Sequence, residues 1–319
     1  MKKTITIIKR NEKNIRELFE SGIQTDMIFR ELQKDTIGRS GSNPTWGYVY
    51  SNSKNGKIKF NGIALHKEYD YDFPLAAYAE KAWCIFGKEL LEDNVRVPFI
   101  EVVEKEPRQA EILSYRIMDN NKEDMIHIKD TLFNKFERDE MKQKRDIYTI
   151  EELLECLKIQ VGSEENYKRV EKAVLNVLLL DCVTNNGDRH AFNWALVRNK
   201  EDDKYDLAVF DHSGSFANML ELREYYAKNG WSTTYVNVDN KKRGYNIGSG
   251  GKEVTEYISS KYPEYFQEFS DKFINKLPKI LDDINREEMK IDFNRLSSKM
   301  IEKKNFLIKL RDRGERDYE

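Results

Sequence analysis

Short runs of alternating hydrophobic and polar residues occupy much of the first 118 residues, a pattern that favours β-strands. The strands predicted in this way span residues 4–8, 46–50, 58–60, 63–67, 97–103 and 110–118. Asn61-Gly62 lies between two of these runs and is typical of a hairpin turn. Helices are expected at 11–21, at 25–33 with Thr25 as N-cap, and at 73–86. Small and turn-forming residues predict a loop at 38–47.

The pattern becomes helical from about residue 146. Thr149 is a suitable N-cap for a helix that begins at Ile150. A second helix is predicted at 166–180, where apolar residues recur at steps of three and four. A polar loop at 184–190 then leads to two short apolar strands at 194–197 and 207–210. A polar, glycine-rich stretch occupies 228–252, and the remainder predicts helices broken by Pro263 and Pro278.

A strand-rich first part followed by a helical second part predicts an α+β fold with two lobes. We expect a boundary between residues 118 and 146, with an N-lobe at 1–118 and a C-lobe at 119–319. The chain has no run of eighteen apolar residues, so a membrane span is not expected.

Composition narrows the class of protein further. Lys and Arg number 54 and Asp and Glu number 56, which gives a net charge of −2. This balance of charges does not indicate direct nucleic-acid binding. Cys84, Cys156 and Cys182 are widely spaced, so neither a disulfide framework nor a structural zinc site is expected. The N-terminal apolar run is too short for a signal peptide, and we expect a soluble, cytoplasmic protein.

Two polar motifs flank the predicted pair of short strands. Gly-Asp-Arg-His-Ala-Phe-Asn occupies 187–193, and Phe-Asp-His-Ser-Gly-Ser-Phe occupies 210–216. Phosphoryl transfer needs a carboxylate that receives the proton of the attacking hydroxyl group, and oxygen ligands that hold Mg²⁺. Asp188, Asn193 and Asp211 have the spacing that brings such groups to one hairpin. Either motif alone also suits an ordinary turn or an N-cap, and their order and context favour the catalytic interpretation.

The combination of Asp-Arg-His-x-x-Asn with Asp-His-x-x-Ser-Phe resembles the HipA-like bacterial serine/threonine kinases. It is also similar to the phosphoinositide 3/4-kinases, which are more distant within the protein-kinase-like fold. The resemblance implies a two-lobed kinase fold that uses ATP and Mg²⁺. It further implies that Asp188 is the catalytic aspartate and that Asn193 and Asp211 are the Mg²⁺ ligands. His190 would brace the catalytic loop.

Small residues at Ser40, Gly41 and Ser42 predict a loop whose backbone N–H groups can approach phosphate oxygens. In HipA-like kinases a loop of this kind lies over the nucleotide, so these three residues are expected to bind it. The stretch lacks a Gly-x-Gly-x-x-Gly pattern, and an ordinary surface turn has the same composition. By the resemblance, Ser40 and Ser42 are also candidate autophosphorylation sites.

A kinase also needs a cation on the α- and β-phosphates, held by an acidic partner. Lys67 ends an apolar strand and Glu80 lies in the next predicted helix, so the two resemble the lysine–glutamate pair of the fold. Lys57 and Lys59 compete for this role, because residues 58–60 are also strand-like. A lysine at a strand end is also commonly a solvated surface residue.

These features favour a serine/threonine protein kinase that transfers the γ-phosphoryl group of ATP to a protein, itself included. A lipid or small-molecule kinase, a nucleotide-binding pseudokinase and an enzyme that transfers AMP stay open. The protein substrate is not identified by the sequence. About forty residues precede the small-residue loop, fewer than in HipA-type toxins, and this difference argues against the toxin role and its usual antitoxin partner. An antitoxin-like regulator stays open as a partner through the family resemblance alone.

Overall fold

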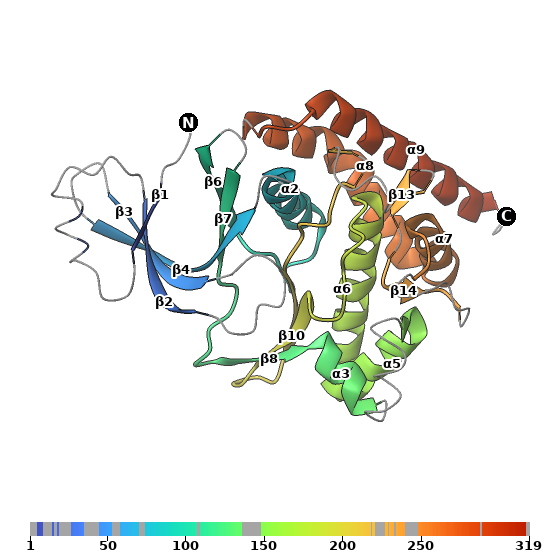
Figure 1. Cartoon of the computed structure of the whole chain (residues 1–319). Coiled ribbons are helices and arrows are strands. Elements are labelled where there is room, and N and C mark those ends of the chain that lie inside the picture. Colours follow the sequence, from blue (N-terminus) through green and yellow to red (C-terminus); the bar gives the residue numbers. More distant parts are fainter. Residues whose placement is uncertain are drawn as a thin grey trace. The chain divides into compact units, whose positions relative to one another are not determined.

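The computed structural model (Figure 1) describes residues 5–8, 15, 18, 27–34, 45–52, 58–69, 74–106, 109–135, 148–217, 219–220, 227–228, 230–232, 234–239, 248–287 and 289–316. The chain forms two compact units. The first comprises Met1–Lys81 and Pro98–Ile117, and the second comprises Ala82–Val97 and Met118–Glu319. The expected lobes at 1–118 and 119–319 stay a prediction.

The first unit is built on a six-stranded sheet with the order β1-β2-β3-β4-β7-β6. Its strands are β1 (Ile5–Ile8), β2 (Met27–Lys34), β3 (Thr45–Asn52), β4 (Ile58–Tyr69), β6 (Ile100–Glu106) and β7 (Gln109–Tyr115). β1 is parallel to β2, and the other neighbours are antiparallel. A cluster of buried apolar side chains fills one face: Met27, Phe29, Val49, Ala64, Val103 and Leu113.

The strand β2 shows that the helix predicted at 25–33 is wrong. Phe29 packs in the main cluster of the sheet, whereas its neighbour Ile28 packs with Ile15 in a second cluster. Burial on both faces produces a continuous apolar run, which removes the alternation that marks a half-exposed strand. The helix predicted at 11–21 lies largely outside the described residues.

The hairpin predicted at Asn61-Gly62 is also wrong, because β4 runs unbroken through both residues. In the pairing with β3, Val49 lies opposite Gly62 and Tyr50 lies opposite Phe60, so Asn61 is an extra residue in β4. Such a β-bulge requires unusual backbone angles, and Gly62 has a φ of 141°. The turn-forming dipeptide therefore bends a strand here and does not end it.

The other strand predictions for this unit are confirmed within a few residues. The runs at 4–8, 46–50, 97–103 and 110–118 correspond to β1, β3, β6 and β7. The loop predicted at 38–47 lies mostly outside the described residues, and β3 already begins at its last three positions. The helix predicted at 73–86 is α2 (Pro74–Leu90), which contributes residues to both units.

The second unit contains a four-stranded sheet with the order β5-β11-β10-β8 and a set of helices. The sheet strands are β5 (Val95–Arg96), β8 (Glu123–His127), β10 (Trp194–Asn199) and β11 (Tyr205–Val209). Two small sheets pair β12 (Ala227–Lys228) with β13 (Trp231–Ser232), and β14 (Val236–Asn237) with β9 (Tyr148–Thr149). The helices are α3 (Ile128–Lys135), α5 (Ile150–Val161), α6 (Glu164–Val183), α7 (Gly251–Lys261), α8 (Pro263–Arg286) and α9 (Phe293–Arg316).

The helix α6 is the central helix of this unit, as Figure 1 shows, and it contacts α5, α7, α8 and β11. Its second half is buried almost throughout, from Val170 onward. The preceding helix α5 begins as predicted. The Thr149 hydroxyl accepts a hydrogen bond from the Glu152 backbone N–H, and the Glu152 carboxylate accepts one from the Thr149 backbone N–H. These two helices and the β10–β11 hairpin confirm the predicted mixture of strands and helices.

Of the two helix breaks predicted at Pro263 and Pro278, the one at Pro278 is wrong. Pro263 begins α8, as expected of a proline in the first turn, but Pro278 lies inside that helix. Burial of apolar side chains on both sides of Pro278, such as Leu277 and Ile280, holds α8 in place despite the lost hydrogen bond. The chain leaves the helix later, after Arg286. Within the described ranges, no helix combines the length and the hydrophobicity that crossing a membrane requires.

Candidate active site

A buried ion pair lies near the C-terminal end of α6. The Asp181 carboxylate accepts hydrogen bonds from Arg189 Nε at 2.8 Å and from the Asn186 side-chain amide at 2.7 Å. The indole N–H of Trp83 donates to the same carboxylate at 3.0 Å. Only 2% of the Asp181 side chain and 3% of the Arg189 side chain are exposed. Donors must surround a carboxylate at this depth, because an unpaired buried charge is strongly destabilising, so the loop after α6 folds back onto the helix.

Arg189 joins the loop after α6 to the segment after β11. Its guanidinium donates to the backbone carbonyl oxygens of Asn193 and Phe210, each at 2.8 Å. It also donates to His212 Nδ1 at 2.6 Å. Trp83 stacks on His212 with ring centroids 3.6 Å apart and an interplanar angle of 7°. One side chain thus fixes two backbone segments, a task that suits the rigid, planar donor set of arginine.

The first of these segments carries Asp188 and Asn193. The Asp188 backbone N–H donates to the side-chain oxygen of Asn186 at 3.2 Å. The side-chain amide of Asn193 donates to the Asp188 backbone oxygen at 2.8 Å. Asp188 is half-buried, whereas Asn193 is buried. Because the amide nitrogen of Asn193 faces Asp188, its amide oxygen is the atom that can bind a cation.

The second segment carries Asp211, which has a φ of 55°. A positive φ is unfavourable for residues other than glycine, and residues in this conformation cluster at functional sites. The Ser213 hydroxyl donates to Asp211 Oδ1 at 2.9 Å. A Cβ on Gly214 would lie 2.7 Å from the Cβ of Asp188, so glycine allows the two segments to approach closely. The structure therefore brings together the segments that carry the three predicted residues.

His190 lies near the carboxylates of Asp188 and Asp211. Burial lowers the pKa of its imidazole, while the negative charges of Asp188 and Asp211 act in the opposite direction. Both carboxylates are thus close enough to His190 to influence it. The bracing role expected of His190 stays a prediction.

The first unit contains the other predicted pair. Lys67 Nζ lies 3.3 Å from Glu80 Oε1, and the Tyr69 hydroxyl donates to Glu80 Oε2 at 2.5 Å. Lys67 is 8% exposed and Glu80 is fully buried, so this is an internal ion pair and not a solvated surface lysine. Of the competing lysines, Lys59 is exposed on β4 and Lys57 lies outside the described residues.

The loop residues Ser40, Gly41 and Ser42 lie outside the described residues. Their expected contact with the nucleotide, and the phosphorylation of the two serines, therefore stay predictions.

Sequence analysis missed the residues that hold the two polar segments together. The sequence does contain one indication of these residues: Asp181 is a single carboxylate within the apolar run Leu-Leu-Leu-Asp-Cys-Val of α6. A charge in such a run needs a buried partner. The partners Trp83 and Arg189 lie 98 and 8 positions away in the sequence, so no local pattern identifies both.

A second set of hydrogen bonds, made by Asn185 and Lys303, fixes the start of the loop after α6. Asn185, with a φ of 51°, donates through its side-chain amide to the backbone oxygens of Ala217 at 3.0 Å and Gly230 at 3.1 Å. Lys303 of α9 donates to Asn185 Oδ1 at 2.9 Å and to the Gly230 oxygen at 2.8 Å. The Lys303 ammonium also lies 3.1 Å from the centroid of the Trp231 ring. Burial lowers the pKa of Lys303 to about 6.

Asp181→Asn is expected to lower the free energy of unfolding by about 3–5 kcal/mol, because it leaves the Arg189 guanidinium buried without its counter-charge. Urea unfolding measures this loss. Asp203→Asn is the matched control, since Asp203 pairs with Arg198 in an exposed turn and a much smaller loss is expected. Equal losses in the two variants would show that the buried pair does not stabilise the loop.

Lys303 should make stability depend on pH. Its pKa is about 6 in the folded chain, against an ordinary value of 10.5, so the unfolded chain binds more protons between these limits. The contribution of Lys303 to stability therefore rises with pH across this window, by at most about 1.4 kcal/mol per pH unit. Urea midpoints of wild type and Lys303→Met at several pH values between 6 and 9 isolate the effect.

Lys309→Met is the control for Lys303, because Lys309 lies on the same helix, α9, and is exposed. Its stability relative to wild type should show no comparable trend. Parallel pH profiles of wild type and Lys303→Met would contradict the assignment of a lowered pKa to Lys303.

No model of a protein family matches the sequence, and no curated protein matches it. Solved structures do match. The Helicobacter pylori proinflammatory kinase CtkA is similar with a TM-score of 0.62 and 14% identity, over 88% of this chain and 94% of that chain. HipA of Shewanella oneidensis MR-1, solved with HipB and its operator DNA, is similar with a TM-score of 0.55 and 12% identity, over 94% of this chain and 73% of that chain. Both are HipA-like kinases, so the resemblance inferred from the motifs is confirmed at the level of the fold. The protein therefore has the fold of the HipA-like kinases.

Proposed function

We propose that the protein is a kinase that uses ATP and Mg²⁺ and transfers the γ-phosphoryl group to serine or threonine residues of a protein, itself included. One observation carries the proposal: Arg189 fixes the segments of Asp188, Asn193 and Asp211 against each other within a HipA-like fold. Phosphoryl transfer in kinases uses such a set: one aspartate near the attacking hydroxyl group, and an asparagine and a second aspartate as metal ligands.

In this proposal Asp188 is the catalytic residue that accepts the proton of the attacking hydroxyl group. Asn186 and Asn193 hold the Asp188 backbone, so the segment that carries the carboxylate is fixed before the substrate arrives. Positioning of this kind supplies much of the rate enhancement in phosphoryl transfer, because the protein forms no covalent bond to the phosphate.

The donor set of Asn193 and Asp211 fits Mg²⁺, which prefers oxygen ligands. The Asn193 amide nitrogen donates to a backbone oxygen, which leaves the amide oxygen for the metal, and Asp211 offers a carboxylate on the adjacent segment. Bound there, Mg²⁺ would neutralise charge that develops on the phosphates.

Lys67 would bind the α- and β-phosphates, with Glu80 as the residue that positions it. The buried carboxylate of Glu80 also accepts a hydrogen bond from Tyr69, so its orientation is fixed from two sides. Ser40, Gly41 and Ser42 would cover the phosphates as the loop of the first unit.

The partner and the location belong to the same proposal. HipA of Shewanella oneidensis MR-1 is solved as a complex with HipB and DNA, and an antitoxin-like regulator is the corresponding partner for this chain. No direct contact with nucleic acid is proposed, because the net charge is −2. We place the protein in the cytoplasm.

Incubation of the purified chain with Mg²⁺ and γ-labelled ATP, followed by mass spectrometry, tests the function. Wild type should label itself or an added protein substrate. Asp211→Ala should lose both transfer and Mg²⁺-dependent nucleotide binding, because it loses a metal ligand. Asp188→Asn should keep nucleotide binding and lose transfer by roughly 10²- to 10⁴-fold, the usual contribution of a general base.

Asp202→Asn is the matched control, since Asp202 lies in the exposed turn between β10 and β11 and pairs with Lys204. Its transfer rate should equal that of wild type. Wild-type transfer by Asp188→Asn would remove Asp188 from its role. Transfer of label from α-labelled ATP, and none from γ-labelled ATP, would show that the protein transfers AMP and is not a kinase. Nucleotide binding that depends on Asp211, without transfer of label to a protein, would favour a pseudokinase or a lipid or small-molecule kinase.

A further inference from the structure

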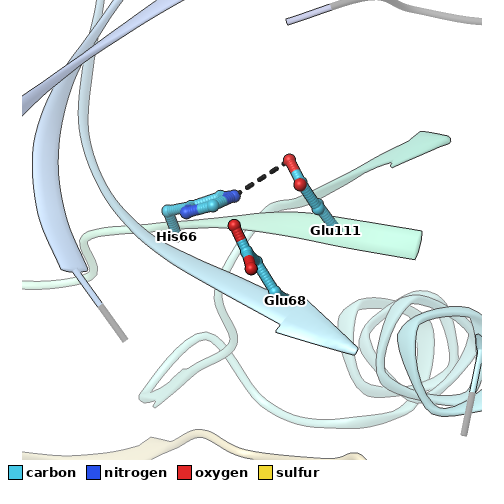
Figure 2. A group of neighbouring side chains, drawn as sticks. All are labelled: His66, Glu68 and Glu111. Atoms are coloured by element: carbon cyan, nitrogen blue, oxygen red, sulfur yellow. Dashed lines mark hydrogen bonds and ion pairs between the residues drawn. The ribbon is translucent and has the colours of Figure 1, made fainter. Parts of the chain in front are cut away.

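Three potential metal ligands converge on the sheet of the first unit (Figure 2). His66 and Glu68 come from β4, and Glu111 comes from β7. Their ligand atoms all lie within 4.8 Å of one another, and His66 Nε2 is 3.0 Å from Glu111 Oε2. Glu68 lies directly opposite Glu111 in the strand pairing, and His66 is two positions before Glu68, so all three side chains are on one face.

The placement of these residues in the sheet favours a cation between them. His66 is 5% exposed and Glu111 is 4% exposed, whereas Glu68 is exposed at the surface. The His66 ring lies 5.3 Å from the ring of Phe29, in the apolar cluster of the sheet. Like charges directly opposite each other destabilise a pair of strands. A cation shared by the carboxylates of Glu68 and Glu111 removes this repulsion.

The donor atoms indicate which cation fits. One imidazole nitrogen and two carboxylate oxygens suit a divalent transition metal such as Zn²⁺, while Mg²⁺ and Ca²⁺ prefer oxygen ligands alone. Tetrahedral zinc with bonds of about 2.0–2.2 Å places its ligands roughly 3.3–3.6 Å apart. The His66–Glu111 distance of 3.0 Å is already close to this value. Glu68 is exposed, so rotation of its side chain can close the rest of the spacing.

We propose that His66, Glu68 and Glu111 form a binding site for Zn²⁺ or a similar divalent transition metal, with a fourth position open to water on the side of Glu68. The earlier expectation that the chain has no structural zinc site rested on cysteine spacing, and this site uses no cysteine. The proposal does not depend on the proposed kinase activity.

The site has a structural consequence for the strand β4. Lys67 lies between His66 and Glu68, and alternation along a strand directs it to the opposite face, where it meets Glu80. A metal held by the two neighbours of Lys67 and by Glu111 would tie β4 to β7 at this point. Occupancy of the site therefore stabilises the strand segment that presents Lys67.

The direct test is a calorimetric titration of the EDTA-treated full chain with Zn²⁺, in the presence of excess Mg²⁺ to occupy sites made of oxygen ligands alone. Wild type should bind one Zn²⁺ per chain at this site and should unfold at a higher temperature with the metal bound. Glu68→Gln should weaken binding by more than about tenfold, since loss of even an outer-shell partner costs 10- to 100-fold. Glu68 is exposed, so this variant is expected to fold.

Glu101→Gln is the matched control. Glu101 is also a buried carboxylate of this sheet, but it accepts a hydrogen bond from the Tyr115 hydroxyl at 2.7 Å and is not one of the three clustered ligands. Its Zn²⁺ affinity should equal that of wild type. A Co²⁺ titration gives a second readout, because an imidazole–carboxylate site produces visible absorption bands that Glu68→Gln should alter.

Three results would overturn the proposal. They are the absence of saturable Zn²⁺ binding to wild type, equal affinities of wild type and Glu68→Gln, and displacement of Zn²⁺ by Mg²⁺ alone.

Discussion

The geometry of the candidate active site depends on one buried cation. Arg189 donates to a carboxylate of α6, to an imidazole, and to backbone oxygens that precede β10 and follow β11. Apolar residues in place of a buried ion pair often leave a protein equally stable or more stable, so stability alone is a weak reason for this pair. The positions of two polar segments are a stronger reason, because apolar side chains cannot direct backbone carbonyl groups. We interpret Arg189 and Asp181 as the residues that preorganise the site, as catalysis by positioning requires.

In the first unit, the alternation of side chains along a strand places two charged groups of residues on opposite faces of the sheet. Three consecutive residues of β4 serve two faces of one sheet: Lys67 pairs with Glu80 of α2, while His66 and Glu68 lie with Glu111 of β7. Each unit also buries an ion pair, Lys67 with Glu80 in the first and Arg189 with Asp181 in the second, in surroundings where a charge is stabilised mainly by its neighbours. In each unit the buried ion pair is therefore anchored on a regular element: β4 carries Lys67 in the first unit, and the end of the buried helix α6 carries Asp181 in the second.

The sequence predicted the elements whose pattern is local. Three- and four-residue spacing identified α6, Thr149 identified the start of α5, and chain order favoured Lys67 over Lys59 as the partner of Glu80. Predictions failed where a feature depends on distant partners. The strand β2 was predicted as a helix, because burial on both faces removes the alternation of apolar and polar residues. The role of Asp181 was missed, because one of its partners, Trp83, is remote in the sequence. Pro278 and Asn61-Gly62 show a related limit, because packing against neighbouring elements outweighs the local preference of a proline or a turn dipeptide.

Hydrogen–deuterium exchange tests most directly the claim that Arg189 holds both polar segments as one assembly. Arg189→Lys keeps the charge but loses the planar donor set that reaches both segments. Peptides that cover residues 184–193 and 210–216 should then exchange faster together, while peptides from α8 keep their wild-type rates, because α8 makes none of the described contacts to Arg189. Faster exchange in only one segment, or in neither, would contradict the account.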